Sequence, residues 1–353
     1  MEPEEEIDTL HPQIYSFVVE KIPEAVEAYI SIAREREKLL GEMREKIKTR
    51  KVERVPPREL SGVKISAADG GGNGKALQGF YFGICTALSF TSMGLEEEDE
   101  SPISAGLPVL WDDEYDPRRR VGSIRDMLMY KVSRRTIEER MPDIFLLDGP
   151  IIPNERYMPQ EDDSEAYRQG YAEMMEALFS MLRAAEKAYR ERRMLFAGVI
   201  KRAGSTRYQK MLGIKRHMRD PLLLNPILSE GERTELIGPG ERRMLSEFPP
   251  ELREISVFFI KTSKLAPMRI EVPGWEKDSA DEIASVIYST SDPISGVPFH
   301  ILRADTLTRV SLPTTDLTYS RFISRLLDKV RSGELREEDL DMGLLRRLEV
   351  WGL

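Results

Sequence analysis

The 353-residue sequence has a formal net charge of −9, and 32% of its residues are charged while 41% are hydrophobic. This balance is ordinary for a soluble globular chain with a sizeable core in one large domain or two, and it argues against a protein coated in basic surface. No apolar run approaches the roughly 20 residues that cross a bilayer. One cysteine, Cys85, and three histidines make a zinc site improbable.

The N-terminus, MEPEEEIDTL, is acidic and lacks a signal-peptide charge pattern, so we expect a cytoplasmic protein without a membrane segment. Apolar residues then recur at helical spacing and predict a long amphipathic helix over residues 12–48, with Pro23 expected to kink or restart it. Such a helix either covers a sheet or pairs with a second subunit.

A hairpin follows in the stretch KISAADGGGNGKALQGFYFGICTALSF, residues 64–90. A short apolar strand ends on Asp69, the glycines from Gly70 to Gly74 are expected to supply the turn, and a second apolar strand covers residues 80–90. Cys85 in that strand is expected to be a core residue.

The remaining elements alternate. Strands are predicted at 107–111, 144–147, 194–200, 255–262 and 268–272, and helices at 123–140, from Asp163 to about 189, at 280–288, within 297–310, at 317–330 and in the tail. Ser123 is a candidate N-cap, and residues 206–250 are interpreted as an insertion of helical pieces and loops. The strand, helix, strand order of residues 144–200 predicts a parallel crossover.

This order predicts an α/β fold with a mixed sheet of the ribonuclease H-like type, flanked by helices. We divide the chain into an N-terminal helical segment (1–55), a main domain (56–333) and a C-terminal tail (334–353).

Two aspartates end apolar strands and precede glycine, Asp69 in AADGGG and Asp148 in DIFLLDG. Carboxylates that meet across a sheet without basic partners are usually neutralised by a divalent cation, and their hard oxygens favour magnesium or manganese. Two such ions promote phosphodiester hydrolysis. The alternative is that each is an ordinary turn aspartate before glycine, and the sequence leaves both interpretations open.

Other chemistries have less support. Gly74-Lys75 is followed by Ala76, and Asp69 occupies the place of the leading glycine, so a Walker A motif is rejected. No G-x-S-x-G elbow accompanies the histidines, and His300 is interpreted as a surface or packing residue. Eleven Lys or Arg and one acid lie between Lys187 and Arg219, which indicates either a phosphate-binding patch or a solvated helix face and loop.

Five segments resemble the NurA nuclease family, in the family's order. They are AADGGG (67–72), FLLDGP (145–150), GVIKRAG (198–204), FFIKTSKLAPMRIEVP (258–273) and GVPFHILRADTLTRV (296–310). The resemblance implies a ribonuclease H-like homodimer that cleaves DNA with manganese or magnesium. It also implies degradation from the 5′ end, cutting of single strands, and DNA end processing for recombinational repair with the hexameric ATPase HerA.

On the matching positions the resemblance makes Asp69 and Asp148 metal ligands and places Lys201 and Arg202 near the DNA backbone. Further along the basic stretch, Arg207 and Lys210 are the other expected DNA contacts.

The candidate site diverges from the family pattern. The family's DGS becomes DGG at Gly71 and DGP at Pro150, and Asp305 stands where a histidine is expected. The family's glutamate, some 16–17 residues before the second aspartate, is missing, since residues 129–132 read MYKV. Asp126 is the nearest substitute, although its helical phase is not ideal.

The leading hypothesis is therefore a NurA-type DNA nuclease in which Asp69, Asp148 and Asp305 bind metal, with Asp126 as a fourth catalytic residue. The missing glutamate motivates a second hypothesis, a catalytically weak or inactive relative that binds DNA or docks the ATPase. A third is related chemistry on RNA.

Overall fold

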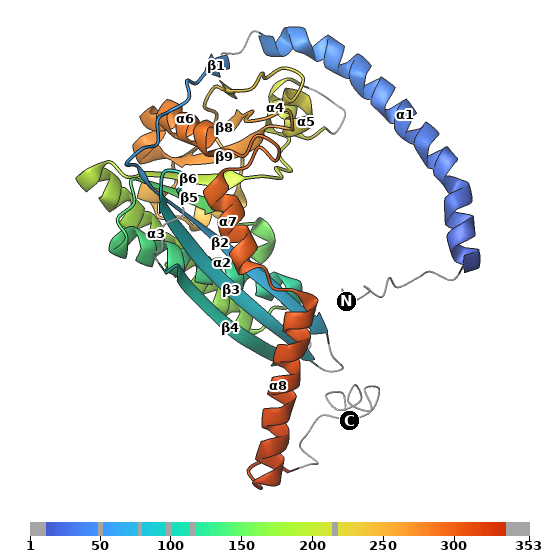
Figure 1. Ribbon diagram of the computed structural model, residues 1–353, viewed down its shortest axis with the longest axis vertical. Coiled ribbons are helices and arrows are strands. Elements are labelled where there is room, and N and C mark those ends of the chain that lie inside the picture. The colour runs from blue at the N-terminus through green and yellow to red at the C-terminus, as the bar shows by residue number, and fades with distance from the viewer. Residues whose placement is uncertain are drawn as a thin grey trace. The chain divides into compact units, whose positions relative to one another are not determined.

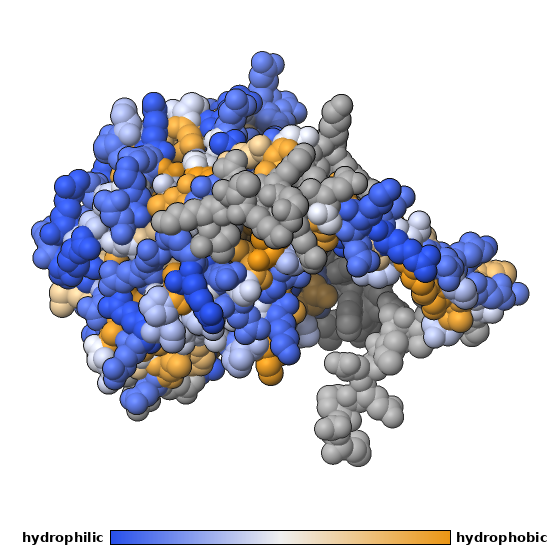
Figure 2. Space-filling model, turned by 90° about the horizontal axis from the view of Figure 1, so that it is seen from above, coloured by the Kyte–Doolittle hydropathy of each residue, from blue (hydrophilic) through white to orange (hydrophobic). Residues whose placement is uncertain are grey.

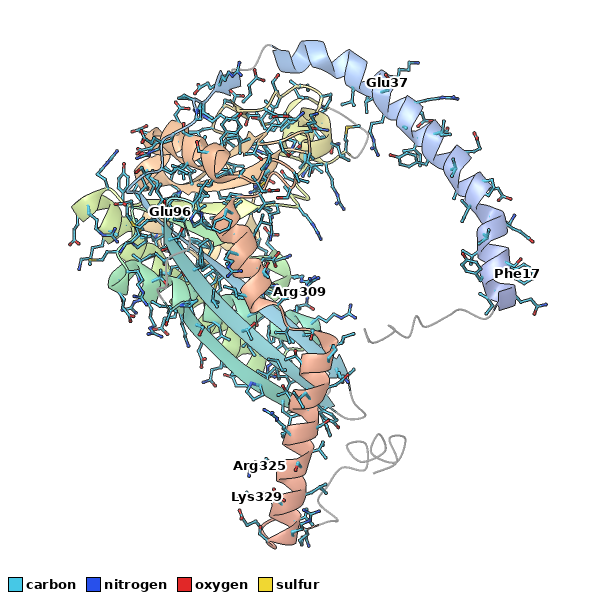
Figure 3. All side chains as sticks on the ribbon, in the orientation of Figure 1. Phe17, Glu37, Glu96, Arg309, Arg325 and Lys329 are labelled. Carbon is cyan, nitrogen blue, oxygen red and sulfur yellow. The ribbon has the colours of Figure 1, made fainter. Side chains whose placement is uncertain are left out.

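The computed structural model describes residues 12–48, 52–76, 80–96, 101–112, 117–213 and 218–336, and the chain divides into two units between Lys51 and Val52. The first unit contains α1 (Pro12–Lys48), which confirms the predicted long helix and passes through Pro23 without ending. Several of its large hydrophobic side chains are exposed: Ile14, Tyr15, Phe17, Val18, Val19, Ile22, Val26, Tyr29 and Ile32. Figure 2 shows orange atoms among the blue ones of this helix, and Figure 3 labels Phe17 and Glu37 on it.

The second unit is built on one sheet of nine strands within the described part of the chain, in the order β1-β7-β8-β9-β6-β5-β2-β3-β4 (Figure 1). The strands are β1 (Val52–Arg54), β2 (Lys64–Ala76), β3 (Phe80–Met93), β4 (Ile103–Asp112), β5 (Ile144–Asp148), β6 (Leu195–Ile200), β7 (Glu232–Thr234), β8 (Ile255–Ile260) and β9 (Met268–Pro273). The β2–β5 and β5–β6 pairs are parallel and the others antiparallel. The predicted mixed sheet and its parallel crossover are confirmed.

Helices cover both faces of this sheet. They are α2 (Pro117–Glu139), α3 (Glu165–Arg192), α4 (Arg207–Met211), α5 (Asp220–Leu224), α6 (Ala280–Thr290), α7 (Phe299–Thr308) and α8 (Leu312–Arg331), with short 3₁₀ turns at Glu155–Tyr157, Arg243–Glu247, Pro250–Leu252 and Gly274–Ser279. In Figure 1 α7 and α8 cross in front of β2 and β3, while α2 and α3 lie behind. Arg309, labelled in Figure 3, marks the junction between α7 and α8. Among the described residues, no helix combines the length and apolar character that crossing a membrane requires.

Strand alternation gives β5 a hydrophobic core on each of its two faces. On β5, Phe145 and Leu147 pack with residues of α2 and α3, whereas Ile144 and Leu146 pack with residues of α6 and α7. Since successive side chains of a strand point to opposite faces, the continuous apolar run of β5 is what a strand buried on both faces requires. Cys85 is buried in the first of these cores, as predicted.

The predicted glycine turn is wrong. The strand β2 continues through Gly70, Gly71, Gly72 and Gly74 to Ala76, and the connection to β3 falls at residues 77–79, outside the described residues. The glycines serve close packing instead, because a Cβ at Gly71 would overlap the backbone carbonyl of Thr308. Glycine in a strand often marks such an approach of another backbone.

Two other details differ from expectation. Ser123 is not an N-cap, because α2 begins six residues earlier and the Ser123 hydroxyl donates to the Arg120 carbonyl inside the helix (3.0 Å). The short strands β1 and β7 were not predicted, since three residues are too few to show a periodicity. The proposed C-terminal helix lies almost entirely beyond Arg336, outside the described residues.

Candidate metal centre

The sheet places Asp69 and Asp148 side by side. In the parallel ladder Ala68 of β2 is the register partner of Leu147 of β5, and each aspartate is the next residue of its strand. Neighbouring strands lie about 4.8 Å apart, so the two carboxylates start from adjacent backbone positions. Alternate residues of a strand share one face of the sheet, so both aspartates lie on the same face as the residues that pack against α6 and α7.

Asp305 reaches the same point from α7. One carboxylate oxygen from each of Asp69, Asp148 and Asp305 lies within 4.8 Å of the other two. The C-terminal end of α7 is fixed to the strands by two hydrogen bonds, from Thr308 Oγ1 to Asp69 Oδ2 (3.1 Å) and from Thr86 Oγ1 to the Thr308 carbonyl (2.8 Å). The bare backbone at Gly71 makes room for this approach.

These acids line a cavity of about 270 Å³ that also contains a lysine. Its lining consists of Asp69, Gly70, Arg125, Asp126, Met129, Asp148, Lys201 and Asp305. Lys201 Nζ lies 2.7 Å from Asp148 Oδ2 and 3.3 Å from Asp305 Oδ2, so it bridges two of the three acids. The Asp148 side chain is largely buried, and that of Asp305 is 56% exposed, which leaves an entrance from solvent.

One lysine does not neutralise three carboxylates. Burial and then the nearby charge of Asp148 raise the pKa of Asp69 to about 7, although the Gly70 N–H donates to its Oδ1 (2.7 Å). Burial also raises the pKa of Asp148, against the opposing effect of Lys201. Oxygen ligands with excess negative charge in a small cavity suit a hard divalent cation, so Asp69, Asp148 and Asp305 fit a Mg²⁺ or Mn²⁺ ion.

The raised pKa of Asp69 predicts a pH dependence for cation binding. A carboxyl that is protonated in the metal-free protein below about pH 7 must lose its proton to become a ligand. We expect Mn²⁺ affinity to increase with pH up to about 7 and then level off, with about one proton released per ion at about pH 6 and almost none at about pH 8. Calorimetry in buffers of different ionisation enthalpy measures this proton count, and binding without proton release at the lower pH would contradict it.

Asp126 lines the cavity but does not join the three-acid cluster. Its Oδ1 accepts hydrogen bonds from Arg125 Nε (2.8 Å) and Arg125 Nη2 (2.6 Å), so its charge is already paired. Met129, one helical turn later on α2, lines the cavity within the segment where the resemblance places a glutamate. Sequence reasoning missed Arg125 and Thr308, and we find no sequence signal that distinguishes them from other polar helix residues.

The expected DNA-binding residues separate into two groups. Lys201 lies in the cavity with the acids, and Arg202 is exposed beside it. Arg207 and Lys210 line a different cleft of about 690 Å³. His300 lies away from both cavities: it is buried, with Nε2 within hydrogen-bond distance of Ser92 Oγ and the Gly94 carbonyl (both 2.9 Å), which agrees with the packing interpretation.

The family model described as the NurA domain matches residues 63–310, a range that contains all three clustered aspartates. The chain belongs to the NurA family. The match supports a nuclease. Among curated proteins, none matches the sequence significantly.

Solved structures of NurA proteins share the fold. The crystal structure of the NurA nuclease from Sulfolobus solfataricus superposes with a TM-score of 0.63 at 16% identity, covering 93% of this chain and 99% of that chain. A structure of NurA with manganese gives a TM-score of 0.56 at 12% identity, covering 90% of this chain and 99% of that one. The likeness confirms the α/β fold with a mixed sheet, flanking helices and a long N-terminal helix.

Proposed function

We propose that this protein is a divalent-metal-dependent nuclease that cleaves DNA at the three-aspartate cluster. One observation carries the proposal: carboxylates from β2, β5 and α7 converge within 4.8 Å at the carboxyl end of β5. Crevices at the carboxyl ends of parallel strands are where α/β proteins bind ligands. The family assignment and the manganese in a related structure support the choice of chemistry and of ion.

In the proposed site, the acids would bind the cation and the basic residues would contact the substrate. Asp69 and Asp148, fixed by the ladder, would hold the cation, and Asp305 would complete the ligand set from the more exposed side. A bound Mn²⁺ or Mg²⁺ ion would supply Lewis-acid activation of the phosphodiester. Lys201 lies within reach of two of these acids and would turn its ammonium group to a phosphate oxygen of the substrate. Arg125, which pairs with Asp126, adds a second positive charge at the cavity wall.

The direct test is incubation of the purified protein with end-labelled single-stranded and double-stranded DNA. We expect cleavage with Mn²⁺, and its loss with excess EDTA, because the acids alone cannot stabilise the developing charge. Labels at the 5′ or the 3′ end distinguish degradation from the 5′ end from internal cutting of single strands, and parallel RNA substrates test the ribonuclease alternative. No cleavage with either ion, alone or with a HerA-type ATPase, would overturn the proposal.

The proposal also covers the oligomeric state, the partner protein and the cellular process. The family resemblance supports a homodimer that works with a HerA-type ATPase in DNA end processing for recombinational repair in the cytoplasm. The exposed hydrophobic side chains of α1 support a protein–protein contact, because so many large apolar side chains exposed along one helix are unusual on a monomer.

The ion pairs of the site favour a second candidate, a catalytically weak or inactive subunit that binds DNA or docks the ATPase. Lys201 forms ion pairs with Asp148 and Asp305, and Arg125 forms one with Asp126, so these carboxylates already have positively charged partners. Titration with Mn²⁺ discriminates, because such a subunit would show no specific binding that depends on Asp148.

A further inference from the structure

A second cleft begins close to the acid cavity and contains two residues of the expected DNA-binding set, Arg207 and Lys210. It has a volume of about 690 Å³ and is lined by residues at or just beyond the carboxyl ends of β5 and β6, including Pro150 and Ile200. Pro150 lies two residues after Asp148, so its Cα is at most about 7 Å from that of Asp148. Ile200 immediately precedes Lys201. Strand phase puts Ile200 and Arg269 on the α3 side of the sheet, opposite the acids.

Two arginines of this cleft keep an unused donor. Arg269, the register partner of Ile200, is 6% exposed, and its Nη2 is held by Glu271 Oε1 at 2.5 Å. The buried Nε atoms of Arg269 and of Arg207 have no hydrogen-bond partner among the described residues. The Arg207 guanidinium packs near Gly240, where an added Cβ would come within 3.4 Å of it. A buried guanidinium N–H without an acceptor costs free energy, which a bound anion would recover.

The charges of the cleft favour an anion with several oxygens. Four cationic side chains line it, Arg207, Lys210, Arg242 and Arg269, against three carboxylates, Glu155, Glu241 and Glu271. Glu271 is committed to Arg269 and to the Ile151 and Ile152 N–H groups (2.7 and 3.2 Å), and Glu155 accepts from the Arg243 N–H (3.0 Å). Glu241 is exposed and is the carboxylate best placed to oppose an incoming anion.

We propose that this cleft is a phosphate site for the nucleic-acid strand, one that grips a backbone phosphate beyond the one at the acids. A strand that crosses the carboxyl ends of β5 and β6 would contact the acid cavity on one side and Arg207, Lys210 and Arg269 on the other. Arginine forks match phosphate oxygens, and the exposed ring of Pro150 accepts the sugar beside them. The inference rests on the proposed function for its substrate class, but not on cleavage.

The test measures binding of a fluorescein-labelled oligo(dT) of about 15 nucleotides, in EDTA, by anisotropy at several salt concentrations. The variant Arg207→Met/Lys210→Met should bind about tenfold more weakly, with a slope of log affinity against log salt that is flatter by about 1. Glu241→Gln should bind about two- to threefold more tightly, a gain that misfolding cannot imitate. The mononucleotide dTMP should compete poorly, which distinguishes a strand site from a free-phosphate site.

Lys187→Met is the matched control. Lys187 is 73% exposed near the end of α3, which leads into the opposite end of β6 from Lys201, and its loss should leave affinity and slope unchanged. Equal binding by the wild type and the double variant, no gain with Glu241→Gln, or strong competition by dTMP would each overturn the inference, as would no binding by the wild type. The binding assay contains EDTA and does not depend on cleavage. If binding depends on the cleft but the protein has no nuclease activity, this inference stands and the proposed function fails.

Discussion

Replacing Asp148 by asparagine should abolish both divalent-cation binding and DNA cleavage. Asp148 is largely buried, lies between β2 and β6 in the sheet, and is the acid that Lys201 approaches most closely. The substitution keeps the size of the side chain but removes the charge that the cation needs. We expect a fall in cleavage rate of about a thousandfold, equivalent to ~4 kcal/mol of transition-state stabilisation, together with loss of Mn²⁺ binding in calorimetry.

Asp143→Asn provides the matched control for this variant. Asp143 precedes the same strand at its other end, where its Oδ2 accepts a hydrogen bond from the Lys64 N–H (2.8 Å), a role that an amide oxygen can fill. Its rate and Mn²⁺ affinity should equal those of the wild type. An Asp148→Asn variant that cleaves as fast as the Asp143→Asn variant would show that chemistry occurs elsewhere.

Placing a methyl group at Gly71 should destabilise the main unit and damage the site together. The added Cβ would overlap the Thr308 backbone and Thr86 Oγ1, so the end of α7 must move away from β2. That movement breaks the Thr86–Thr308 and Thr308–Asp69 hydrogen bonds and takes Asp305 from the cluster. We expect Gly71→Ala to lower the free energy of unfolding by about 3 kcal/mol in urea titrations, with weaker Mn²⁺ binding.

Gly170→Ala is the control for Gly71→Ala, and we expect it to raise the free energy of unfolding rather than lower it. Gly170 lies within α3, and nothing is within 4 Å of the position its Cβ would take. Alanine there should stabilise by about 0.5–1 kcal/mol, because it favours the helix over the unfolded chain. If Gly71→Ala were as stable as the wild type, the close approach of α7 to β2 would be wrong.

The sequence predicted the pair Asp69 and Asp148 because each ends an apolar run, and parallel neighbours bring the ends of such runs together. Asp305 entered only through the family resemblance, since a single acid on a short helix has no pattern of its own. The glycine run was misread because glycine marks turns and close packing alike, and only the position of α7 decides between them.

The rest depends on contacts that join distant parts of the chain. The pairing of Arg125 with Asp126 is local, but its position at the cavity wall follows from the packing of α2 against β2. Arg269 joins the second cleft through its register with Ile200, some 70 residues earlier, and no periodicity encodes that pairing.

The adjacent placement of two acids on hydrogen-bonded strands has a kinetic consequence. Their spacing is set by the backbone ladder, so an ion binding at the proposed site would find the gap already formed and would need no rearrangement of the strands. The group that would have to move is the ammonium group of Lys201, which pairs with Asp148. Its flexible side chain changes conformation far faster than strands rearrange. Loading should therefore be limited by encounter and dehydration of the ion rather than by motion of the protein.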